Sequence, residues 1–144
     1  MAFCSVWTTC SWPTTWSHNN PIDITGDATP ERYRDASLAV AEDPGVDSIL
    51  MMLSPQAMTQ PLEVAKAVVD VSEQSSKALL CCWMGEEQVA GGRKLLEDSG
   101  IPAFRMPETA IELFHHISTY YKNQKLLLQT PEPTRQHGRP EAEG

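Results

Sequence analysis

The chain has 144 residues, enough for one domain with a hydrophobic core, and its 19 acidic and 11 basic residues give a formal net charge of −8. This balance argues against a nucleic-acid binder, which needs a basic face to displace counterions from phosphates. No apolar run has the length of a membrane span and residues 1–16 lack the pattern of a signal peptide, so we expect a cytoplasmic protein.

Both ends of the chain differ in composition from its middle. Residues 1–16 hold three of the four Trp residues and no charge, and they show no helical or strand period. We interpret residues 1–18 as an atypical segment outside the domain, from an altered start or a shifted reading frame. Residues 131–144 are rich in proline and poor in apolar side chains, which predicts a flexible tail. The domain is therefore predicted to cover residues 19–130.

Between these ends, apolar segments of strand length alternate with amphipathic segments of helical length. The predicted strands are residues 22–25, 46–53, 77–84 and 101–105, and the predicted helices are residues 30–41, 60–72, 86–99 and 107–128. Asp27 or Thr29 could cap the first helix, and Gly100 is expected to end the third. The order βαβαβαβα with short connections predicts an α/β fold with a parallel sheet and right-handed crossovers.

Three loops follow predicted strands, at residues 26–29, 54–59 and 85–87. Ligands of open parallel sheets bind outside the carboxyl ends of the strands. Residues 54–59 are the best candidate for an anion site, because their backbone N–H groups open a helix whose dipole places about half a positive charge there. An ordinary capped helix start is the competing interpretation. Asp23 and Asp27 are an acidic pair near a strand end, or else turn and cap residues.

The cysteines and histidines form no recognisable catalytic or metal-binding motif. Cys81 and Cys82 are adjacent in an apolar run and are expected to be small buried residues. Cys4 and Cys10 are too far apart for a zinc knuckle, and all four cysteines are expected to be free thiols. His115 and His116 are expected at or near a helix surface. No P-loop or nucleophile elbow occurs, so the sequence predicts no metal site and no catalytic residue of its own.

Several short motifs, in their order and spacing, resemble one flavodoxin-like module of the NDP-forming acyl-CoA synthetases. They are Asn20-Pro21-Ile22-Asp23, Gly26-Asp27-Ala28, Asp43-Pro44-Gly45-Val46-Asp47, Ser54-Pro55-Gln56-Ala57-Met58-Thr59, Trp83-Met84-Gly85, Ser99-Gly100-Ile101-Pro102 and Tyr121-Lys122-Asn123-Gln124-Lys125. The module is the third of the alpha part and corresponds to the CoA-ligase domain of the succinyl-CoA synthetase beta subunit. The resemblance implies a three-layer flavodoxin-like parallel sheet.

The module normally opens with a Gly-rich βα unit, which residues 1–18 do not show. Its strand order is 2-1-3-4-5, so a sheet that lacks its first βα unit would have a gap between residues 22–25 and 46–53. That gap would leave backbone groups and apolar surface unpaired.

The resemblance also implies a reaction, which makes acyl-CoA from a carboxylic acid, CoA and a nucleoside triphosphate through an acyl phosphate and a phosphohistidine. CoA, ATP or ADP, and Mg belong to the parent family, and none is expected to be bound by this chain alone. By the same resemblance, one helix-start loop would line the phosphohistidine site with Pro55, Gln56, Ala57, Met58 and Thr59. The neighbouring loop would contribute Asn20, Asp23, Gly26 and Asp27.

We therefore expect a piece of an acyl-CoA synthetase, or of a bacterial lysine acetyltransferase that fuses a synthetase-like region to a GNAT domain. Its expected partners are other synthetase domains or subunits (CoA-binding, phosphohistidine, ATP-grasp) or further copies in a homo-oligomer, with no nucleic acid and no membrane. The chain alone is expected to lack synthetase activity. The alternative is a stand-alone, non-catalytic flavodoxin-like module that binds CoA or docks onto a partner. A flavin-binding flavodoxin is disfavoured, because the loops lack a Ser/Thr-rich phosphate cradle.

Overall fold

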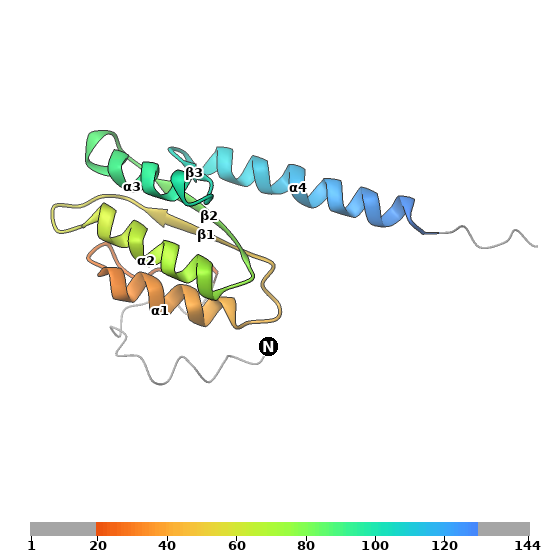
Figure 1. Ribbon diagram of the computed structural model, residues 1–144, viewed down its shortest axis with the longest axis horizontal. Helices are drawn as coiled ribbons and strands as arrows, with labels where there is room; N and C mark the ends of the chain where they lie inside the picture. The colour runs from red at the N-terminus through yellow and green to blue at the C-terminus, as the bar shows by residue number, and fades with distance from the viewer. Residues whose placement is uncertain (1–19, 130–144) are drawn as a thin grey trace, which may run out of the picture. The chain divides into compact units, whose positions relative to one another are not determined.

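The computed structural model describes residues 20–129, so the segments assigned to an atypical N-terminus and a flexible tail lie outside the described residues. The elements are α1 (Pro30–Ala41), β1 (Ser48–Leu53), α2 (Pro61–Gln74), β2 (Ala78–Trp83), α3 (Glu87–Asp98), β3 (Ala103–Phe104) and α4 (Pro107–Leu127) (Figure 1). The predicted α/β class with a parallel sheet is confirmed, and the predicted helices end within two residues of the observed ones.

The strand predicted at residues 22–25 is wrong, because these residues belong to no sheet. Their main chain is held by side chains instead: the Thr25 amide donates to Asp23 Oδ1 at 2.8 Å, and Arg32 Nη1 donates to the Ile24 carbonyl at 3.4 Å. A strand exists only through hydrogen bonds to a neighbouring strand. Within residues 20–129 no strand lies in hydrogen-bonding register with this segment.

The sheet has the order β1-β2-β3, and both pairs are parallel. The register runs from Ser48 opposite Ala78 to Leu53 opposite Trp83. The Met84 amide donates to the Leu53 carbonyl at 2.9 Å, so the main-chain groups of Leu53 face β2. Because a parallel strand directs the groups of alternate residues to opposite sides, those of Leu50 and Met52 face the open edge of β1.

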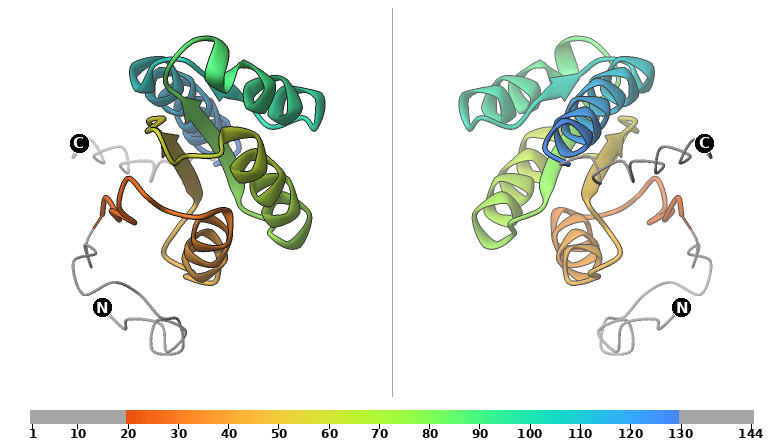
Figure 2. Two further views of the ribbon diagram at one scale, coloured as in Figure 1. Left: turned by 90° about the vertical axis from the view of Figure 1, so that its left-hand side faces the viewer. Right: turned by 90° about the vertical axis from the view of Figure 1, so that its right-hand side faces the viewer.

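Helices α1, α2 and α3 lie side by side on one face of the sheet (Figures 1 and 2). The apolar positions of α2 recur at helical spacing and turn toward the strands. Together the helices and strands bury a continuous core of Ile49, Met51, Leu53, Val64, Ala65, Val68, Val71, Leu79, Cys81, Trp83, Val89, Leu96 and Ile101. Gly100 has a positive φ of 78° directly after α3, as predicted for the residue that ends this helix.

The two cysteines within the described residues, Cys81 and Cys82, are buried free thiols, as predicted. His115 and His116 are exposed. Cys82 lies outside the main core. Burial raises the pKa of its thiol, and the charge of Glu108, in the first turn of α4, raises it further. No helix of residues 20–129 combines the length and the apolar character that a membrane span needs.

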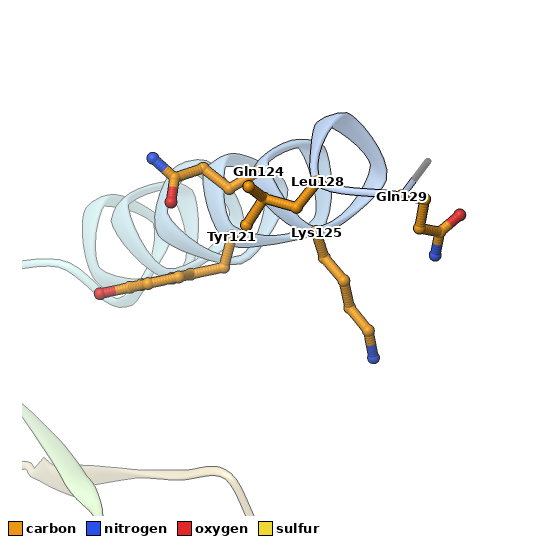
Figure 3. A pocket seen from close by; sticks show the side chains of 5 residues that line it. All are labelled: Tyr121, Gln124, Lys125, Leu128 and Gln129. Carbon is orange, nitrogen blue, oxygen red and sulfur yellow. The ribbon is translucent and has the colours of Figure 1, made fainter. Parts of the chain in front are cut away.

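A second unit begins at Leu113, within α4. Its described part, residues 113–129, is the remainder of this helix and its end. A shallow, open hollow there is lined by Tyr121, Gln124, Lys125, Leu128 and Gln129, all from one helix end (Figure 3). One helix surface encloses no ligand, so this hollow is not a candidate site.

Candidate functional site

Three loops meet at the end of the molecule where α1, α2 and α3 begin (Figure 2, left). Contacts around two glycines show how closely they approach. A β-carbon added to Gly26 would lie 2.1 Å from Gln56 Nε2, and one added to Gly85 would lie 3.2 Å from Pro55 Cγ. The loop after β1 is therefore packed between the loop before α1 and the loop after β2. The structure thus brings Gly26 close to Gln56, and Gly85 close to Pro55.

The loop at residues 55–59 is a closed turn. The Gln56 amide donates to Thr59 Oγ1 at 2.9 Å, and the Thr59 amide donates to the Gln56 carbonyl at 3.0 Å. The turn uses two of its N–H groups in this way. The amides of Ala57 and Met58 find no acceptor among residues 20–129, and both residues are exposed. These two N–H groups are available to a ligand.

Helix α2 begins just after this turn and its first turn is not capped. Gln60 is the N-cap residue and makes no side-chain cap hydrogen bond, and the first helical bond runs from the Val64 amide to the Gln60 carbonyl at 3.0 Å. Pro61 has no N–H, so Leu62 and Glu63 carry the unused amides of this helix start in the described part of the chain. Helix α1 differs, because Thr29 accepts from the Arg32 amide at 3.3 Å.

The start of α2 is anchored to the end of β2. Trp83, which is fully buried, donates its indole N–H to the Pro61 carbonyl at 3.2 Å. Helix α3 comes close at the same point: a β-carbon added to Gly92 would lie 2.8 Å from the Pro61 carbonyl oxygen. Gly92 therefore serves close helix packing.

The predicted acidic pair of the first loop acts within the loop itself. Asp23 accepts from the Thr25 amide, and Thr25, which has a positive φ of 72°, contacts the Asp27 carboxylate through its hydroxyl. This hydroxyl contact, then the amide of Asp27 itself and then Arg32, hold the pKa of Asp27 below its usual range. Asp27 is thus negatively charged and lies 3.5 Å from Arg32. The negative charge of Asp27 does not favour the binding of an anion beside it.

Asn20 is exposed, and no hydrogen bond joins it to residues 55–59 within the described part of the chain. Of the residues expected in the first loop, Gly26 alone has a contact with the second loop that the structure records.

Sequence analysis missed Arg93, which holds the third loop. Its Nη1 donates to the carbonyls of Trp83 at 3.0 Å and Gly85 at 2.7 Å, and its Nη2 donates to the Glu86 carbonyl at 3.4 Å. The residue is 7% exposed. A signal was present: Arg93 shares a helical face with the buried residues Val89, Gly92 and Leu96. A charged residue on an apolar face indicates a specific buried partner.

The arrangement suits the binding of an anion by main-chain N–H groups rather than the breaking of bonds. The amides of Ala57, Met58, Leu62 and Glu63 lie in one short stretch, at the positive end of α2. In the described residues no group of three His, Cys, Asp or Glu side chains could hold a metal ion.

No family model matches the chain. In sequence it is 37% identical, over 103 residues, to an ADP-forming acetate–CoA ligase of Archaeoglobus fulgidus, an alignment that covers 72% of this chain and 14% of that protein. It is 41% identical over 112 residues to an ADP-forming acetate–CoA ligase of Methanocaldococcus jannaschii, covering 75% of this chain and 16% of that protein.

In fold it is similar to the dinucleotide-forming acetyl-coenzyme A synthetase 1 of Ca. Korarchaeum cryptofilum, solved in complex with phosphate and ADP. The TM-score is 0.77 at 28% identity, over 88% of this chain and 28% of that one.

Each of these proteins is much longer than the matched region. The chain spans 14% of the Archaeoglobus protein, 16% of the Methanocaldococcus protein and 28% of the solved Korarchaeum chain. All of these relatives are archaeal, so the comparisons give no support to a bacterial parent protein. They are described as ligases or synthetases, which leaves the expected fusion to an acetyltransferase without support as well.

Proposed function

Because this chain is related in sequence and fold to one segment of the NDP-forming acyl-CoA synthetase family, we propose that it acts as one domain of such a synthetase. In this proposal the chain does not carry out the chemistry. It supplies the start of α2 and the loop at residues 55–59 to the site where the phosphoryl group of a phosphohistidine or acyl phosphate is held. Other domains or subunits supply the histidine, the nucleotide site and the main CoA site.

The observation that carries the proposal is the group of unused amides at the start of α2 and in the loop before it. Ala57, Met58, Leu62 and Glu63 offer N–H groups with no acceptor among the described residues. Such groups, together with the helix dipole, stabilise phosphate without a positively charged side chain. The Gly26–Gln56 and Gly85–Pro55 contacts hold this segment from both sides, so the donors are fixed before a ligand arrives.

CoA, ADP and magnesium are assigned to the assembled synthetase. The described residues include no carboxylate cluster for a divalent cation, so we place any magnesium site on another domain. The alternative, a stand-alone module that binds CoA or docks onto a partner, remains a second candidate, but no contact within residues 20–129 favours it over the synthetase domain. Descriptions of the relatives as ligases favour the synthetase over an acetyltransferase fusion.

The proposal is tested by titrating the isotope-labelled chain with inorganic phosphate and following amide chemical shifts by NMR. We expect saturable shifts at Ala57, Met58, Leu62 and Glu63. The amides at the start of α1 are a control within the same spectrum, because Thr29 already caps that helix. Phosphate shifts that are absent, or that are as large at Glu31 and Arg32 as at the start of α2, would contradict the proposal.

A further inference from the structure

Arg93 is a buried positive charge without a negative partner. It is 7% exposed, and within residues 20–129 no carboxylate oxygen lies within 4.0 Å of it. The other described arginines, Arg32, Arg34 and Arg105, each lie 3.1 to 3.5 Å from a carboxylate oxygen, although they are more exposed. Burial of an unpaired guanidinium is costly, so something specific must compensate it.

The compensation comes from main-chain carbonyls at the end of β2. Arg93 donates to the carbonyls of Trp83, Gly85 and Glu86, three positions of one short turn. The planar fork of guanidinium donors can hold several acceptors in a fixed geometry, whereas the single nitrogen of lysine cannot reproduce it. Gly85 has a φ of 119°, a conformation that few residues other than glycine adopt. The side chain therefore adds three hydrogen bonds to a turn in which the Glu86 carbonyl also accepts from the Val89 amide at 3.3 Å.

This turn supports the neighbouring loop. The position of a β-carbon on Gly85 would be 3.2 Å from Pro55 Cγ, so the Gly85 backbone packs directly against the first residue of the loop at residues 55–59. A movement of Gly85 would remove the support from Pro55. Three elements are thus connected in series: the Arg93 guanidinium, the Gly85 turn and the Pro55 loop.

We propose that Arg93 is a positioning residue for the anion site, acting through the Gly85 turn on the loop that bears the amides of Ala57 and Met58. Its charge, unneutralised by any described carboxylate, also favours an anion at this end of the sheet. The inference rests on the proposed function, because it concerns the same anion.

The test compares Arg93→Met, Arg93→Lys and Lys94→Met with the unchanged chain. Lys94→Met is the matched control: it removes a positive charge from the next residue of α3, where Lys94 is exposed and pairs with Asp98 at 3.2 Å. Two quantities are measured in each protein. Hydrogen exchange of the Val89 amide, which donates to the Glu86 carbonyl at 3.3 Å, reports the order of the turn, and the inorganic phosphate titration reports the affinity of the anion site. Circular dichroism confirms that each variant is folded.

In Arg93→Met we expect faster exchange in the turn and phosphate binding weaker by about tenfold, the size of a lost charged hydrogen bond. In Arg93→Lys we expect faster exchange with a smaller loss of affinity, because the charge is kept and the fork is lost. Lys94→Met should change neither quantity.

The outcomes separate the two proposals. An unchanged chain that does not bind phosphate overturns the proposed function and the inference together. A chain that binds phosphate, with folded Arg93 variants that match it in exchange and in affinity, overturns the inference alone. If Arg93→Met does not fold, Arg93→Lys is the deciding variant. Hydrogen exchange and phosphate affinity equal to those of the unchanged chain overturn the inference. Faster exchange in the turn together with weaker phosphate binding supports it.

Discussion

Gly91 and Gly92 are neighbours in α3 with opposite surroundings. A β-carbon on Gly92 would lie 2.8 Å from the Pro61 carbonyl oxygen and 3.1 Å from Trp83 Nε1, whereas one on Gly91 would meet nothing within 4 Å. We expect Gly92→Ala to lower the free energy of unfolding by about 1–3 kcal/mol, because backbone and a fully buried indole must move. Gly91→Ala, the control, should raise it by about 0.5–1 kcal/mol, since alanine favours the helix. Urea denaturation measures both, and equal shifts in the two variants would refute this packing.

Burial of Cys81, and secondarily its neighbour Cys82, raises the pKa of the Cys81 thiol from 9.0 to about 12. Since the folded-state pKa lies above the unfolded one, this thiol contributes stability that is complete below pH 9 and is lost as pH rises toward 12. We expect the free energy of unfolding to fall with a slope approaching about 1.4 kcal/mol per pH unit in this window. Cys81→Ala should reduce the slope in urea unfolding series across the same range. Slopes that coincide in the two proteins would contradict the assignment.

At the scale of elements, β1 is an edge strand of the sheet that residues 20–129 form, and its two sides differ. Tyr33 donates its hydroxyl to the Met52 carbonyl at 3.3 Å, which satisfies one group of the open edge. The Leu50 and Met52 amides, on the same edge, find no acceptor among the described residues. Edges without charged residues or proline favour pairing with another strand, and the sequence of β1 contains neither.

This geometry predicts an alternating pattern of hydrogen exchange along β1. We expect the amides of Leu50 and Met52 to exchange rapidly, while those of Met51 and Leu53, which face β2, exchange slowly. The central strand β2 serves as the control, because neighbours on both sides protect Cys81 and Cys82. Slow exchange at Leu50 and Met52 would show that a strand covers this edge in solution.

The helices and the three observed strands could be predicted because their signals are local. Pro30 with Thr29, the apolar spacing of α2 and Gly100 after α3 each act within a few residues. The status of residues 22–25 could not be predicted locally, because a strand depends on a neighbour. Contacts such as Gly26 with Gln56 and Gly85 with Pro55 join residues far apart in the sequence, and neither the composition nor the hydrophobic periodicity encodes them. The residues around the site were thus partly predictable, and their mutual geometry was not.

At the scale of the whole molecule, the chain is much shorter than the ligases that it matches in sequence. It spans 14% of the length of the Archaeoglobus protein and 16% of the Methanocaldococcus protein. We expect the purified chain to form no acyl-CoA from acid, CoA and ATP, because in the proposed function other domains or subunits supply the histidine, the nucleotide site and the main CoA site. Steady turnover, measured as thioester formation and abolished by Arg93→Met, would contradict this prediction.

At Thr25, in the segment before α1, the backbone conformation and the side-chain contacts favour different residues. Its positive φ of 72° costs a β-branched residue roughly 1–2 kcal/mol, and glycine would remove that cost. Yet its hydroxyl contacts Asp27 and accepts from Arg32 Nη1 at 3.0 Å, and these bonds need threonine or serine. A library randomised at this position and selected by heat alone would be enriched in glycine and asparagine. Selection for the intact loop would retain hydroxyl side chains. Comparison of the two enriched populations would show whether threonine is retained for thermal stability or for the structure of the loop.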